Sequence, residues 1–347
     1  MLLYRLGSDP EMLFTKQADF LWKKIPSLQV FNCDKETGLK SFIGCDAHPA
    51  TAEIRPGAAI SIDRHLIDLA HAMRAINGYL RSAPNPVRLM ALPWVDDEAL
   101  GGHIHLSFFF DDPNAKFVME TLNQIFHVGA TRPYDLTIPT PNMFDQHDEA
   151  WKKLYDYTLR AATAEAFTPE VVCKVLNYLT VPFENWVQPW QEREKRYSWC
   201  MNSPHYNQDP NYLVRWVPNT RPKNKPRLSK LAYLHVEYRT PSTWLHHPAL
   251  AYVYFALAKL TMLNFKTIRD KVFEAQQIVV FHDSPGNHIF KEVFDERLAK
   301  LLPQLSRSSP DLKYLPEALK VCERSRERWY GDRFSGVDFS AWENLLG

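Results

Sequence analysis

The sequence predicts an α+β fold in which one face of a sheet is polar and helices cover the other face. Two observations predict it. Short segments with strand-like alternation occur in the first 110 residues and again near residue 235, and each separates charged or imidazole side chains from apolar ones. Longer segments with apolar residues at helical spacing lie between and after them. No internal repeat divides the 347 residues, so we expect a single elaborated domain, 1–347.

The helices are predicted from a 3.6-residue apolar period and from start signals such as Thr168-Pro169 and His247-Pro248. The expected helices lie at about 61–80, 113–129, 148–191 and 248–277, with two more before residue 329. A strand is expected at about 233–239, and the proline- and base-rich stretch 216–230 is expected to be a loop. The chain would thus have a helical insertion at about 111–230 and a helical C-terminal part at about 247–347.

Composition and charge exclude several function classes. The 41 Lys and Arg against 40 Asp and Glu leave a net charge of +1, which gives no long-range field toward nucleic acid or acidic membranes. With only 12 glycines, the chain contains no phosphate-binding P-loop motif, no dinucleotide-binding G-x-G-x-x-G and no hydrolase G-x-S-x-G. A nucleotide would have to be bound by another route.

The sequence also indicates the cellular compartment of the protein. The five cysteines are scattered without a C-x-x-C spacing, which predicts neither a disulfide framework nor a zinc ribbon and is typical of a reducing interior. Arg5 and Asp9 interrupt the N-terminus too early for a signal peptide, and the apolar stretch 249–258 is too short to span a bilayer. We therefore expect a soluble, cytoplasmic protein. No pattern predicts its oligomeric state.

Four segments place polar side chains two residues apart, so that each set would share one face of a strand. These sets are Asp9 and Glu11 in GSDPEMLF, Thr51, Glu53 and Arg55 in TAEIRP, His103, His105 and Ser107 in GGHIHLSF, and His235, Glu237 and Arg239 in YLHVEYRTP. Taken alone, each segment is also typical of a solvent-facing edge strand. Four together favour a shared functional face.

Carboxylates that converge on such a face require cations. At a separation of ~5 Å and an effective dielectric of ~20, each like-charge pair costs roughly 3 kcal/mol. Oxygen-rich sites with an imidazole suit Mg²⁺ or Mn²⁺ better than zinc, and Mg²⁺ typically bridges carboxylates to phosphates. The arginines at positions 55 and 239 would then contact phosphoryl oxygens. This combination indicates phosphoryl transfer without a P-loop.

The ordered motifs resemble those of a known family. They are Gly7-Ser8-Asp9-Pro10-Glu11, Asp46 followed by Glu53 and Arg55-Pro56, Gly101-Gly102-His103-Ile104-His105, and Glu237-Tyr238-Arg239. In this order and spacing they resemble the carboxylate–amine ligases (amidoligases) of the glutamine synthetase and glutamate–cysteine ligase superfamily, and most closely its phage-type branch. The resemblance covers residues 7 to about 244.

The resemblance implies a twisted antiparallel sheet, as in the glutamine synthetase catalytic domain, whose concave face binds ATP with Mg²⁺ (or Mn²⁺). It implies metal ligands at Asp9, Glu11, Glu53, His103 and Glu237. Arg239 would be catalytic and contact the nucleotide, while Arg55 and Asp46 would act in catalysis and bind substrate. His105 stands where these ligases usually have asparagine, and we place it with the nucleotide-binding residues.

The implied reaction transfers the γ-phosphoryl group of ATP to a substrate carboxylate, and an amine then attacks the acyl phosphate to form an amide. The substrates would be small-molecule or peptide carboxylates and amines, and a phage-encoded protein would act in the host cytoplasm. Asp46 would help to deprotonate the incoming ammonium.

Two other functions remain open from the sequence. One is a metal-dependent hydrolase that uses the His103-x-His105 pair, and the other is a non-catalytic relative that retains the sheet. The histidine at position 48 and the segment 196–207 are interpreted as structural or as part of the site. The basic loop 221–230 is interpreted as a solvated charge run, with a phosphate-covering lid as its functional alternative.

Overall fold

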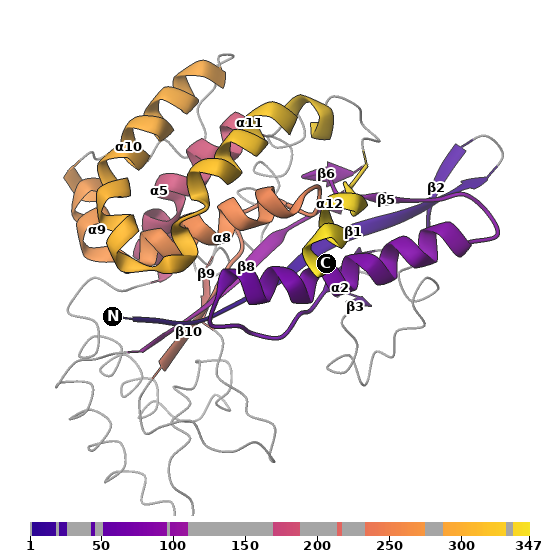
Figure 1. Cartoon of the computed structure of the whole chain (residues 1–347), viewed down its shortest axis with the longest axis horizontal. Coiled ribbons are helices and arrows are strands. Elements are labelled where there is room, and N and C mark those ends of the chain that lie inside the picture. The colour runs from indigo at the N-terminus through magenta and orange to yellow at the C-terminus, as the bar shows by residue number, and fades with distance from the viewer. Residues whose placement is uncertain are drawn as a thin grey trace, which may run out of the picture.

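The computed structural model describes residues 2–18, 21–25, 43–45, 51–95, 98–109, 169–187, 214–216, 233–274, 287–330 and 336–347. Helices, one large open antiparallel sheet and a small two-stranded sheet make up this part of the chain, which confirms the predicted α+β class (Figure 1). The sheet has eight strands, and its centre is the 17-residue strand β1, Leu2–Ala18.

The strand order places β1 between segments that are far apart in sequence. Along the main path the order is β3-β4-β1-β8-β10-β9, while β2 and β5 pair with the second half of β1. The strands other than β1 are β2 Leu21–Ile25, β3 Ile43–Cys45, β4 Thr51–Ile54, β5 Val87–Met90, β8 Gly102–Phe109, β9 Val214–Trp216 and β10 Tyr233–Tyr238. A separate two-stranded sheet consists of β6 Trp94–Val95 and β7 Glu98–Ala99.

Pro10 lies within β1 although proline has no N–H to donate to a ladder. It pairs with Gly102 at the last position of the β1–β8 ladder, and from Glu11 onward β1 pairs with β4. The Gly102 N–H donates instead to the carbonyl of Pro241, at 2.8 Å. The proline therefore stands where β1 changes partners, and no ladder bond is lost there.

The helices follow the strands in two groups. Helix α2, Ile62–Ser82, precedes β5, and α5, Pro169–Val187, lies between β8 and β9. The C-terminal group consists of α8 Pro248–Leu263, α9 Phe265–Glu274, α10 Asn287–Ser308, α11 Leu315–Tyr330 and α12 Phe339–Glu343, with short 3₁₀ turns at Pro310–Leu312 and Asn344–Leu346. These helices lie in the part of the chain, about 247–347, that the sequence predicted to be helical.

The helix starts follow the expected chemistry. Ser61 caps α2 by accepting a hydrogen bond from the Arg64 N–H, and α5 begins at Pro169, as predicted. The His247 side chain caps α8 by accepting from the Ala249 N–H, with Pro248 in the first turn. Of the predicted helical insertion at 111–230, the structure describes only α5 and the short strand β9.

The prediction of one continuous helix from 248 to 277 is wrong. Helix α8 ends at Leu263, and α9 starts at Phe265 in a direction bent by 87°. Asn264 caps the end of α8, where its backbone N–H and its side-chain amide both donate to the carbonyl of Leu260. An asparagine that satisfies terminal carbonyls in this way ends the helix without a glycine or a proline.

Within the described residues, no single helix is long and apolar enough to cross a membrane, and only the bent pair of α8 and α9 meets that criterion when the two are taken together.

The core lies between the sheet and the helices. Apolar even-numbered residues of the central strands face it. Those with exposed fractions of 0 to 2% include Leu6, Met12, Phe14, Ile54, Ile104, Leu106 and Tyr238. Helices α2 and α8 pack on β1 and on each other, α5 and α11 pack on α8, and α10 packs on α5 (Figure 1). The odd-numbered residues are therefore left for the other face.

Candidate functional site

Strand register places the predicted polar side chains in three cross-strand rows. Opposite one another lie Gly7, His105 and Glu237 in the first row, Asp9 and His103 in the second, and Glu11 and Glu53 in the third. Because side chains alternate along a strand, these odd-numbered residues share the face that does not carry the helices. Residues separated by more than 200 positions in sequence thus meet in one cluster.

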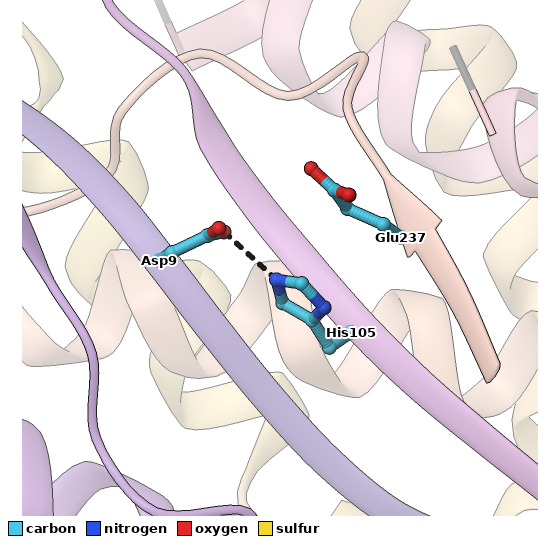
Figure 2. Close-up of side chains that lie close together, drawn as sticks. All are labelled: Asp9, His105 and Glu237. Carbon is cyan, nitrogen blue, oxygen red and sulfur yellow. Dashed lines mark ion pairs between the residues drawn. The ribbon is translucent and has the colours of Figure 1, made fainter. Parts of the chain in front are cut away.

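Asp9, His105 and Glu237 converge at the centre of this face, from β1, β8 and β10 (Figure 2). His105 Nε2 lies 3.0 Å from Asp9 Oδ1, and one ligand atom from each of the three residues lies within 4.8 Å of the others. Two carboxylates and one imidazole at these separations form a donor set that divalent metals use.

His103 lies between two groups of carboxylates. Its Nδ1 is 3.5 Å from Asp9 Oδ1 and 3.8 Å from Glu237 Oε1, while its Nε2 is 3.8 Å from Glu11 Oε1. The imidazole is buried, with 4% of its surface exposed. His103 therefore links the Asp9–Glu237 pair to the Glu11–Glu53 pair.

Gly101 fixes the orientation of the Glu11 carboxylate. The Gly101 N–H donates to Glu11 Oε2 at 2.5 Å, and the Glu11 N–H donates to the Gly101 carbonyl at 2.8 Å. A Cβ at position 101 would overlap the His103 ring and lie 3.1 Å from Glu11 Oε2. Glycine is required here because backbone and imidazole approach so closely.

Each of the two predicted arginines contacts a carboxylate of the cluster. Arg55 Nε forms an ion pair with Glu53 Oε1, and Arg239 Nη1 lies 2.6 Å from Glu237 Oε1. Gly44 makes room for the first of these arginines, because a Cβ there would lie 2.6 Å from Arg55 Nη1. Both guanidinium groups therefore border the carboxylates of the cluster.

The carboxylates control the charge of the imidazoles. Burial alone would raise the pKa of the Asp9 carboxyl, but His105 and then His103 hold that pKa well below its usual range. Burial opposes the charged form of His105, yet Asp9 and Glu237 raise the pKa of this imidazole to about 8. Burial and Arg239 lower the pKa of His103, while Glu11 and Asp9 raise it, and the net shift is upward. The face thus favours positive charge between its carboxylates.

The predicted site residues fall into two groups. Those that the structure brings together are Asp9, Glu11, Glu53, Arg55, His103, His105, Glu237 and Arg239. Asp46, the histidine at position 48 and the segments 196–207 and 221–230 lie outside the described residues. The second group keeps the status of a prediction.

Sequence reasoning missed Glu184, a buried carboxylate of α5 with 1% of its surface exposed. Its Oε1 accepts a hydrogen bond from the Ser242 N–H at 2.7 Å, and Ser242 forms a β-bridge with Gly101. Glu184 therefore braces the segment that orients Glu11. A single acid within the apolar stretch from Leu176 to Trp186 was the available signal.

No family model and no curated protein matches the chain. One similar solved structure is the complex between the prokaryotic ubiquitin-like protein Pup and its ligase PafA, with a TM-score of 0.48, 9% identity and coverage of 93% of this chain and 65% of that chain. Another is a bifunctional glutathione synthetase from Pasteurella multocida, with a TM-score of 0.48, 10% identity and coverage of 99% and 52%. The chain spans less than two thirds of either protein, and likenesses at this level carry no functional inference for it.

Proposed function

We propose that this protein is an ATP-dependent carboxylate–amine ligase of the glutamine synthetase and glutamate–cysteine ligase superfamily, which forms an amide or peptide bond through an acyl phosphate. The observation that carries the proposal is the register of four antiparallel strands, which gathers three carboxylate-bearing segments, two imidazoles and two arginines on one face. The order of the sequence motifs supports the same family.

The residues present fit a divalent ion. Asp9 Oδ1 is buried and forms no well-aligned hydrogen bond within the described part of the chain, and its neighbours are His105 Nε2 at 3.0 Å and His103 Nδ1 at 3.5 Å, which are nitrogens that could share a cation with it. Glu11 and Glu53 lie directly opposite each other, which is unfavourable without compensating positive charge. Asp9, Glu11, Glu53, His103 and Glu237 would hold Mg²⁺ or Mn²⁺ ions. When bound, these ions would neutralise the phosphate oxygens of ATP.

The remaining residues are assigned by their position. Arg239 would contact the γ-phosphoryl group in transfer and the oxyanion of the acyl intermediate, because its guanidinium borders the Glu237 carboxylate. Arg55, beside Glu53, would orient the substrate carboxylate or a phosphate. His105 would contact the nucleotide phosphates from the row next to Arg239. Asp46 would accept a proton from the amine.

The reaction has two balanced steps. A substrate carboxylate oxygen attacks the γ-phosphorus, the bond from that phosphorus to the β–γ bridging oxygen breaks, and ADP leaves. The amine nitrogen then attacks the acyl carbon, the phosphate leaves, and the nitrogen gives up a proton to a base. We propose small-molecule or peptide carboxylates and amines as substrates, a glutamine synthetase-like catalytic domain spanning residues 1–347, and action in the cytoplasm.

The test is release of ADP and phosphate from ATP and Mg²⁺ by the full chain with pooled carboxylates and amines. Release should require both pools, and Glu53→Gln should lower it on the order of 100-fold, since a neutral amide holds cations poorly. Glu317→Gln is the matched control, because this exposed residue of α11 forms its ion pair with Lys320 one helical turn away and lies outside the charged cluster of the sheet.

Two results would contradict the proposal. Turnover of a substrate without ATP would favour the metal-dependent hydrolase. A wild-type chain that binds no Mg-ATP, together with a Glu53→Gln variant that is unchanged in every assay, would favour the non-catalytic relative.

A further inference from the structure

We propose that His105 supplies a nitrogen ligand to a metal site formed with Asp9 and Glu237, and that this ligand makes the site prefer Mn²⁺ to Mg²⁺. The inference deepens the proposed function, on which it rests for the role of the ion, by naming the ligand and the ion. His105 would act on the nucleotide phosphates through this ion, and His103 would serve an ion on the Glu11 side, which its Nε2 faces. The metal binding itself can be measured without nucleotide or substrate.

The first support is the spacing of the ligand atoms. An ion bound at about 2.1 Å from each ligand keeps neighbouring ligand atoms about 3 to 4 Å apart. The Nε2 of His105 is 3.0 Å from Asp9 Oδ1, and all three ligand atoms lie within 4.8 Å of one another. Figure 2 shows the three side chains converging from neighbouring strands. Binding an ion would require Glu237, whose Oε1 also pairs with Arg239 Nη1 at 2.6 Å, to move toward Asp9.

The second support is the unused capacity of the Asp9 carboxylate. Its Oδ1 is fully covered and forms no well-aligned hydrogen bond within the described residues, and its neighbours are two imidazole nitrogens, His105 Nε2 at 3.0 Å and His103 Nδ1 at 3.5 Å. A buried acceptor without a well-formed hydrogen bond is uncommon in native proteins, and a bound ion is one explanation for it. A metal ion between this oxygen and His105 Nε2 would satisfy both atoms.

The third support is the space reserved for the His105 ring. Gly7 lies opposite His105 in the β1–β8 ladder, and a Cβ at position 7 would lie 3.3 Å from the His105 Cβ. A larger residue would therefore push against the base of the imidazole. The glycine leaves room for the ring to lie beside β1 and reach Asp9, two residues further along that strand.

His103 is less suited to this role. Its Nδ1 lies 3.5 Å from Asp9 Oδ1 and 3.8 Å from Glu237 Oε1, and its other nitrogen faces Glu11. His103 therefore divides its two nitrogens between two groups of carboxylates, while His105 directs Nε2 to Asp9. This difference assigns the Asp9–Glu237 pair to His105.

The donor set predicts the ion. Carboxylate oxygens suit Mg²⁺ and Mn²⁺ alike, whereas an imidazole nitrogen favours transition metals. Magnesium also loses its bound water reluctantly and prefers oxygen ligands. Two carboxylates with one imidazole therefore favour Mn²⁺ over Mg²⁺.

The experiment titrates the full chain with Mn²⁺ and follows the electron paramagnetic resonance signal of the free ion, without nucleotide and then with competing Mg²⁺. We expect saturable Mn²⁺ binding that Mg²⁺ displaces poorly. His105→Asn should weaken Mn²⁺ binding roughly tenfold or more and reduce the preference over Mg²⁺. His71→Asn, at an exposed position of α2, is the matched control and should leave both unchanged.

Unchanged Mn²⁺ affinity in a folded His105→Asn variant would overturn the proposal, as would equal wild-type affinities for Mn²⁺ and Mg²⁺. If the His105→Asn variant fails to fold, pulsed electron paramagnetic resonance of Mn²⁺ bound to the His103→Asn variant tests the ligand assignment instead. A remaining nitrogen coupling supports His105, and its loss overturns the assignment. Absence of ADP release with intact Mn²⁺ preference would defeat only the ligase, whereas ADP release without the preference would defeat only this inference.

Discussion

The two faces of the central strands differ in what their burial achieves. On β8, Ile104 is fully buried against the helices, while its neighbours His103 and His105 lie among carboxylates on the other face. Burying an apolar side chain stabilises the fold, whereas burying carboxylates and imidazoles costs free energy unless their charges are compensated. The helix-covered face therefore supplies stability, and the charged face consumes part of it to hold a site.

Ile104→Ala should produce the largest effect on stability. Removing this fully buried side chain from the core should lower the free energy of unfolding by about 2 to 5 kcal/mol, because transfer and cavity costs add. Urea unfolding followed by circular dichroism measures it. Ile104→Val should lose only about 1 kcal/mol. Equal losses in the two variants would contradict the assignment of this face to the core.

The pH dependence of stability that His65 causes provides a test of burial on the helix-covered face. This buried residue of α2 contacts the Ser8 hydroxyl through Nε2 at 2.8 Å, and burial lowers the pKa of its imidazole to about 4. The unfolded chain, with a His pKa near 6.5, binds the proton first as pH falls, so stability is lost from about pH 6.5 down to about pH 4. The loss should be about 3 kcal/mol.

The measurement compares urea unfolding of wild type and His65→Gln from about pH 7.5 to about pH 4. The stability difference between them should shrink by about 3 kcal/mol over this range, since the variant has no group that titrates at position 65. His71→Gln, at an exposed position of the same helix, should show no such change. A constant difference between wild type and His65→Gln would mean that His65 is not buried in its neutral form.

The sequence predicted the alternation of the faces, because period two is visible within each strand. From this alternation, His105 and Glu237 could be expected to share a face of the sheet. That they lie directly opposite each other could not be expected, since register depends on the pairing of strands more than 120 residues apart. The roles of Gly7, Gly44 and Gly101 could not be predicted, because close approach of backbone to side chain is a tertiary property.

The break at Asn264 was missed for a related reason. Apolar periodicity continues through it, and only the side-chain and backbone donations to Leu260 show that α8 ends there.

The identities of the charged residues on the sheet could be predicted from the sequence, but the contact that joins the two faces could not. That contact runs from Glu184 on α5 through Ser242 to Gly101.

Glu184→Ala should therefore affect both faces at once. It leaves the buried Ser242 N–H without its side-chain acceptor, at a cost of about 1 to 3 kcal/mol of stability. The shift of Gly101 should also weaken Mn²⁺ binding, because Gly101 orients Glu11. Glu184→Gln retains an acceptor oxygen and should restore most of both properties. If Ala and Gln variants bind Mn²⁺ like the wild type, the brace does not reach the site.

The smallest change in stability is expected for Glu11→Gln on the charged face. The substitution removes repulsion from Glu53 opposite but also the attraction to His103 at 3.8 Å, and the amide oxygen can still accept from the Gly101 N–H, so these opposing effects should leave the metal-free stability within about 1 kcal/mol of the wild type. A difference in stability between the wild type and Glu11→Gln should appear when metal is added. Mn²⁺ at about 100 times its dissociation constant should stabilise the wild type by about 2.7 kcal/mol, and the same concentration should stabilise Glu11→Gln much less. Thermal or urea unfolding with and without Mn²⁺ measures both values. A large loss of metal-free stability in this variant would mean that the charged face also supports the fold, and the division between the two faces would then be wrong.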